Sequence, residues 1–222
     1  MTDHDGRPLH LTWNYTREEM IADAVVHAIG IAFAVIGGTA IITLAAVFAG
    51  GAQLAAVTIY ALGLVALLSV SAAYNLWPVS RTKWILRRLD HALIYVLIAA
   101  TYTPFITRFP HGFDRYALLF GVWAVAVGGA VLKVTLPGRF DRLSIVLCIL
   151  LGLSGGLAWS TVSSALPPST VWLMLSGGAI YIAGVVFHVW DGLRFQNAVW
   201  HAFVLVASIF FYSAVLDGVV FA

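Results

Sequence analysis

The residues that could do chemistry in this chain are acids, histidines and amides that stand just inside long apolar runs. Asp90 and His91 open the run that ends near Phe105, directly after the cations Arg87 and Arg88. An acid at the mouth of a membrane-length run is costly unless it faces protein or water, so Asp90 indicates a functional interior site. Neighbouring helical residues point about 100° apart, so we expect His91 to bridge to another helix instead.

Further polar side chains lie at the same depth of the apolar runs. They are Asp23, His27, Ser71, Asn75, His188, Asn197 and His201. Asp23 and His27 are spaced by four, as are Ser71 and Asn75, so each pair shares one helix face. We predict that helix closure gathers this set into one polar pocket that includes Asp23, His27 and His91.

The elements that position these residues are membrane-spanning helices. Hydrophobic residues make up 61% of the 222 residues and charged ones 10%, which is too apolar for a soluble domain. A span needs roughly 20 apolar residues, and seven runs reach that length. They cover residues 22–49, 52–76, 88–107, 114–132, 143–164, 169–190 and 197–220. We therefore predict an all-α membrane protein, a seven-transmembrane helix bundle over residues 20–222 behind a polar tail at residues 1–19.

Cations and aromatic residues predict how the spans sit in the membrane. Of the 12 Lys and Arg residues, all but Arg108 and Arg115 fall in the N-terminal tail and in or beside every second loop. Because cytoplasmic loops retain cations, we place the N-terminus in the cytoplasm and the C-terminus outside, in a multi-pass protein of the cell inner (plasma) membrane. Aromatic residues near span ends, among them Trp84 and Tyr102, are expected to be interfacial anchors.

Two short motifs on the third span are typical of one family. Leu-Asp-His stands at residues 89–91 and Tyr-Thr-Pro at residues 102–104. This stretch resembles the third helix of the hemolysin III family, in the progestin and adipoQ receptor superfamily, and helix count, orientation and motif order are similar over nearly the whole chain. The resemblance implies a seven-helix fold and three zinc-binding histidines on the second and seventh helices. It also implies Asp90 and Ser71 as candidate catalytic residues.

The zinc positions of this chain depart from that pattern. Asn75 and Asn197 stand where two of the three histidines are expected, and His201 is the one that remains. Asp23 likewise stands where the family usually has Asn. A neutral amide is a poor zinc ligand, so zinc as a cofactor would require a rewired site with His188 as the substitute ligand. We favour the other hypothesis, a metal-free hydrogen-bond network in which the two amides fill the vacated space.

These observations leave three functions open. The favoured one is a non-catalytic or weakly catalytic regulator of membrane lipid homeostasis, with its polar pocket on the cytoplasmic side. The alternative is a metal-dependent intramembrane lipid amidase or hydrolase with a rewired zinc site, and the third is a cytolysin. The expected partner is a membrane lipid such as a fatty acid or a ceramide-like lipid. No basic cluster suggests nucleic acid, and the single Cys148 excludes a disulfide framework or a cysteine metal site.

Overall fold

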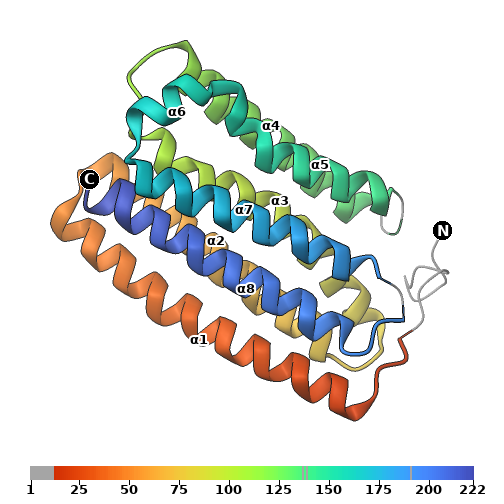
Figure 1. Ribbon diagram of the computed structural model, residues 1–222. Helices are drawn as coiled ribbons and strands as arrows, with labels where there is room; N and C mark the ends of the chain where they lie inside the picture. Colours follow the sequence, from red (N-terminus) through yellow and green to blue (C-terminus); the bar gives the residue numbers. More distant parts are fainter. Residues whose placement is uncertain (1–12, 137, 139, 191) are drawn as a thin grey trace.

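The computed structural model describes residues 13–136, 138, 140–190 and 192–222, and these residues form helices and loops without a strand. The helices are α1 (Arg17–Phe48), α2 (Gly51–Leu76), α3 (Arg81–Ile106), α4 (Phe113–Thr135), α5 (Asp141–Leu153), the 3-10 helix η1 (Ser154–Ala158), α6 (Trp159–Ala165), α7 (Pro168–His188), α8 (Gln196–Val215) and the π-helix η2 (Leu216–Val220) (Figure 1). They make seven spans long and apolar enough to cross a membrane, which confirms the predicted fold class. The fifth span joins α5, η1 and α6, and the seventh joins α8 and η2. Residues 1–12 of the predicted tail lie outside the described residues.

The start of α1 is set by a capping box. Thr16 accepts a hydrogen bond from the Glu19 amide (3.3 Å), and the Glu19 carboxylate accepts one from the Thr16 amide (2.9 Å). These bonds satisfy amides that have no partner within the helix, so α1 begins at Arg17, slightly before the predicted domain boundary. The other Glu19 oxygen accepts the Phe195 amide (3.0 Å) and thereby ties the start of α1 to the start of α8.

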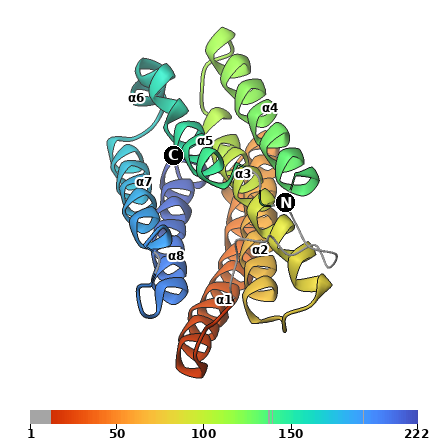
Figure 2. The same ribbon diagram turned by 90° about the vertical axis from the view of Figure 1, so that its right-hand side faces the viewer.

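The helices form one bundle in which chain neighbours pack side by side. α2 packs on both α1 and α3, α3 packs on α4, α7 packs on α8, and α8 returns to α1. In the view of Figure 2, α7 and α8 stand on one side and α3 and α4 on the other. Buried residues such as Ile41 and Leu64 fill the contacts between helices, whereas Ile36 and Leu157 expose 71% and 92% of their surface. Apolar outer faces of this kind suit contact with lipid tails.

The fifth span is broken near its middle, where α5 gives way to η1. Tyr102 of α3 supplies hydrogen-bond partners for the backbone at this break. Its hydroxyl donates a hydrogen bond to the Gly152 carbonyl (2.6 Å) and accepts one from the Gly155 amide (2.8 Å). Backbone groups at membrane depth have no water to satisfy them, so they need such partners. Tyr102 therefore joins α3 to the fifth span. Trp84, which is only 3% exposed, is a packing residue rather than the expected interfacial anchor.

A charge cluster, formed by Arg87 of α3, Lys133 of α4 and Asp141 of α5, joins these three helices just before the fifth span begins. Lys133 Nζ donates to Asp141 Oδ1 (2.7 Å), and Arg87 Nη2 donates to Asp141 Oδ2 (3.2 Å). Burial alone would raise the pKa of Asp141, but the hydrogen bond from Lys133 and the charge of Arg87 outweigh it and lower that pKa to about 2. Arg87 is thus engaged with α5.

Candidate functional site: a polar cluster at the end of an internal cavity

A cavity of about 800 Å³ extends along the bundle, and it is partly open, since lining residues such as Leu153 and Trp159 are exposed. Its lining includes Asn75, Asp90 and His201 at one end of the spans and Phe109 and Leu166 at the other. The acidic, basic, histidine and amide lining residues gather at the first of these ends, where α1, α3 and α8 begin and α2 ends, and the rest of the wall is mainly apolar with scattered hydroxyl groups such as those of Thr101 and Ser208. Cavities of roughly 300–1,000 Å³ with a few convergent polar groups are typical ligand sites. The polar end of this cavity is therefore the candidate functional site.

Asp23 and His27 of α1 meet His201 of α8 at the polar end. The His201 Nδ1 atom lies 2.6 Å from Asp23 Oδ1, where the carboxylate accepts its hydrogen bond. His27 Nε2 lies 3.5 Å from Asp23 Oδ2 and has no hydrogen-bond partner among the described residues, although it is buried. The three residues offer ligand atoms that all lie within 4.8 Å of one another. Within the described ranges, this is the cluster that could hold a metal ion.

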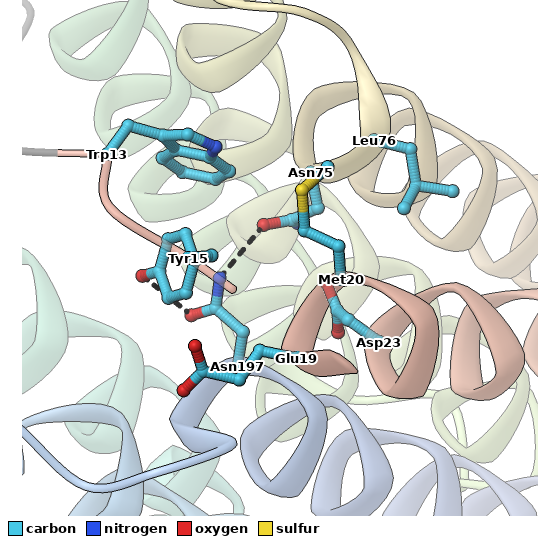
Figure 3. Close-up of a pocket in the computed structure, with 8 residues that line it drawn as sticks. All are labelled: Trp13, Tyr15, Glu19, Met20, Asp23, Asn75, Leu76 and Asn197. Atoms are coloured by element: carbon cyan, nitrogen blue, oxygen red, sulfur yellow. Dashed lines mark hydrogen bonds between the residues drawn. The ribbon is translucent and has the colours of Figure 1, made fainter. Parts of the chain in front are cut away.

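Asn75 and Asn197 form a hydrogen-bond network at the positions where the resemblance implies zinc ligands. Asn197 Nδ2 donates to Asn75 Oδ1 (3.4 Å), and Asn75 Nδ2 donates to the Ser71 carbonyl (2.9 Å). Tyr15 Oη donates to Asn197 Oδ1 (3.4 Å; Figure 3). Each amide oxygen thus already accepts a hydrogen bond, and neither amide is a good zinc ligand. These two positions do not fit a zinc ion.

Asp90 and Ser71 face the same end of the cavity as the metal-compatible cluster. Asp90 is buried, lies beside the Ser71 hydroxyl and is within electrostatic reach of His27 and His201. His91 also lines the cavity, but its charged neighbours are those of the charge cluster. Asp90 and His91 therefore line different parts of the cavity wall, which is consistent with their separation of about 100° around the helix axis.

His188 lines the cavity but stands apart from the Asp23–His27–His201 cluster. Its ring lies 4.8 Å from that of Trp200, measured between centroids, and its carbonyl accepts a hydrogen bond from Gln196 (2.8 Å). The candidate substitute ligand is therefore not grouped with His201 in the structure.

The segment before α1 covers the polar end of the cavity, which the sequence did not lead us to expect. Trp13 and Tyr15 line both the cavity and a small recess beside it (Figure 3). Lys83 Nζ lies 3.5 Å from the centroid of the Trp13 ring and donates to the Tyr74 and Trp77 carbonyls (2.7 and 2.9 Å). A cation beside an aromatic face is a favourable contact, and this one holds the segment in place. The signal available in the sequence was a pair of aromatic residues in an otherwise polar tail.

Comparisons with known proteins agree with the motifs on the third span. A family model described as "Haemolysin-III related" matches residues 15–212. The chain is 33% identical over 202 residues to "Hemolysin-3 homolog" of Bacillus subtilis (strain 168), covering 91% of this chain and 95% of that protein. It is 31% identical over 199 residues to "Hemolysin-3" of Bacillus cereus, covering 90% and 91%. The human "Monocyte to macrophage differentiation factor" is 29% identical over 165 residues, covering 71% of this chain and 67% of that protein.

Proposed function

Since this chain belongs to the haemolysin-III related family of multi-pass membrane proteins, we propose that it binds a membrane lipid in its internal cavity and regulates membrane lipid homeostasis without catalysis. The observation that carries the proposal is the cavity of about 800 Å³, apolar along most of its length and polar at one end. An acyl chain would occupy the apolar part and a headgroup the polar end. We place the protein in the cell's plasma membrane with its N-terminus in the cytoplasm.

The polar end would decide which lipid is bound. Burial of apolar groups gains about 0.8 kcal/mol per CH₂ only when they leave water, and a lipid tail in the bilayer has already done so. An acyl chain therefore gains little by moving into the cavity. A headgroup that bonds to His201, Asn197 or Asp90 in a low-dielectric site gains more. We expect selection for a small polar headgroup, such as that of a fatty acid or a ceramide-like lipid.

The proposal is tested by filling the cavity. Gly178 of α7 lines it, and a Cβ placed there meets no atom within 4 Å, so Gly178→Leu should occupy space that the acyl chain needs. Gly128 of α4 is the matched control, because its Cβ also meets nothing within 4 Å but it is not among the residues that line the cavity. Native mass spectrometry would measure a long-chain fatty acid or ceramide bound to each purified variant.

We expect wild type and Gly128→Leu to retain the lipid and Gly178→Leu to lose at least about nine-tenths of it, which corresponds to 1.4 kcal/mol or more of binding free energy. Equal lipid binding by all three proteins would contradict the proposal. Loss of lipid binding in both variants would point to a general defect in packing. Gly152 also lines the cavity and has open space at its Cβ, so a well-folded Gly152→Leu would then have to lose the lipid as expected for Gly178→Leu.

A second candidate function is metal-dependent hydrolysis of a lipid amide or ester. The observation that favours it is the Asp23–His27–His201 cluster, which lies at the end of the cavity where Asp90 and Ser71 also face. An ion held there would supply a Lewis acid. Asp90 would accept a proton and Ser71 would orient a polar headgroup.

Hydrolysis is measured by release of fatty acid from ceramide and from an ester analogue by the purified protein. Asp90→Asn should abolish the release while lipid binding persists. An absence of turnover in wild type supplied with zinc would leave the non-catalytic function as the sole proposal.

A further inference from the structure

We infer that this chain has a binding site for a zinc-like divalent cation formed by Asp23, His27 and His201, between α1 and α8. The resemblance to hemolysin III places the ion between the second and seventh spans, at Asn75, Asn197 and His201. The inferred site keeps His201 and replaces the two amides by an acid and a histidine of the first span. The second candidate function would use this ion, but the inference of the site requires neither lipid binding nor hydrolysis, and its test measures metal alone.

The distances within the cluster fit an ion better than they fit a complete hydrogen-bond network. Ligand atoms about 2.0–2.1 Å from a tetrahedral ion are separated from one another by about 3.3 Å. His27 Nε2 and Asp23 Oδ2 are 3.5 Å apart, which matches that spacing. The 2.6 Å contact between His201 and Asp23 is a hydrogen bond, and a small opening of this contact would bring the third ligand to the same spacing.

The buried nitrogen of His27 is the observation that points most directly to a ligand. His27 is 4% exposed, and its Nε2 atom has no hydrogen-bond partner among the described residues. A buried polar atom without a partner costs free energy unless something else satisfies it. This atom faces the Asp23 carboxylate and belongs to a residue that lines the cavity, so an ion at this point would satisfy it.

The local charge also favours a cation. Asp23 and Asp90 are 5% and 8% exposed. In the described part of the chain neither forms an ion pair with a lysine or arginine, and the partners of Asp23 are His27 and His201, which carry charge only when protonated. Arg87 of α3 is bonded to Asp141. Acids at membrane depth need compensating positive charge, and a divalent ion beside Asp23 would supply it. The resemblance puts Asn at position 23, so the carboxylate that completes the ligand set is a feature of this chain.

The test uses zinc alone as the probe and the full-length protein in detergent. After treatment with a chelator and dialysis against zinc, elemental analysis should find one zinc per chain in wild type. His27→Gln, which keeps a polar side chain of similar reach, should lose it. Asn197→Ala is the matched control: it alters a position at which the resemblance implies a zinc ligand, the hydrogen bonds of the Asn197 side chain join it to Asn75 and Tyr15 rather than to the three inferred ligands, and the variant should keep the zinc.

Cobalt provides a second readout that does not depend on activity. Bound Co²⁺ should show the intense visible absorption of a tetrahedral site in wild type and in Asn197→Ala, and lose it in His27→Gln. Elution as a single species and an unchanged unfolding temperature without metal would show that His27→Gln folds; if it does not fold, Asp23→Asn replaces it. The inference is overturned if wild type binds no zinc, if His27→Gln or Asp23→Asn still binds it, or if Asn197→Ala alone loses it.

Discussion

Removing a single hydroxyl from Tyr102 should weaken the protein far more than removing one from Tyr60. In Tyr102→Phe, the Gly152 carbonyl and the Gly155 amide lose their partner at the break in the fifth span. The Gly152 carbonyl is exposed and the Gly155 amide is half-buried, but at membrane depth an unsatisfied backbone group has no water to replace its partner and costs about 1–3 kcal/mol. Ser154, whose hydroxyl already donates weakly to Tyr102 (3.4 Å), can recover part of this loss. We therefore expect a loss of about 2–4 kcal/mol in the free energy of unfolding.

Tyr60→Phe is the matched control, because it makes the same chemical change in the same bundle. The Tyr60 side chain is 1% exposed, and its hydroxyl has no hydrogen-bond partner among the described residues. Deleting a buried hydroxyl that bonds to nothing removes a desolvation cost. Tyr60→Phe should therefore be neutral or stabilising, by up to about 1 kcal/mol.

The assay is thermal unfolding of each purified variant in one detergent, followed by the loss of the monodisperse peak on size exclusion. For a protein of this size, about 2–4 °C of Tm corresponds to 1 kcal/mol. Tyr102→Phe should thus lower Tm by on the order of 10 °C, whereas Tyr60→Phe should leave it unchanged or raise it by a few degrees. Equal Tm values for the two variants, or a larger drop in Tyr60→Phe, would refute the argument that Tyr102 repairs the broken span.

Three further predictions concern packing, charge and topology. Gly129→Ala should cost about 1–3 kcal/mol, because its Cβ would lie 2.5 Å from the Tyr95 ring, while Gly128→Ala, whose Cβ meets nothing, should be silent in the same Tm assay. Because the pKa of Asp141 falls from 3.8 to about 2 on folding, its stabilising contribution is present above pH 4 and is lost as pH falls toward 2. The Tm difference between wild type and Asp141→Asn should therefore shrink as pH falls from 4 toward 2. A constant difference would contradict the lowered pKa of Asp141. A reporter fused after residue 81 should be cytoplasmic and one after residue 111 exported, and a cytoplasmic reporter at the second point would overturn the orientation.

The number and kind of the helices could be predicted from the sequence. A membrane span forms most of its backbone hydrogen bonds within its own helix, and the length of its apolar run is visible in the sequence. The seven predicted runs and the seven observed spans agree in order, and their bounds agree within three residues except at the starts of the first and third spans, which begin at Arg17 and Arg81 rather than at residues 22 and 88. Relations within one helix were equally accessible. Asp23 and His27 are four residues apart, and the helical repeat alone places them on one face.

Relations between helices were decided by the tertiary structure. His201 bonds to Asp23 across 178 residues of sequence, while His188, at the same depth, packs on Trp200 instead. The sequence offered His201 as the ligand that the resemblance retains and His188 as a possible substitute ligand. It could not show whether the two side chains converge, because sequence gives the depth of a side chain in the membrane but not the rotation of its helix about its own axis. That rotation follows from how close-packed neighbours fit together.

The packing partners of Tyr102 and Lys83 were likewise not accessible from the sequence. The position of Tyr102 near a span end suggested the membrane interface, and that of Lys83 suggested a loop. Their partners, the broken backbone of the fifth span and the carbonyls at the end of α2, come into reach only when the helices pack. Single-helix periodicity therefore determined which residues share a face, and the packing of all seven spans determined which faces meet.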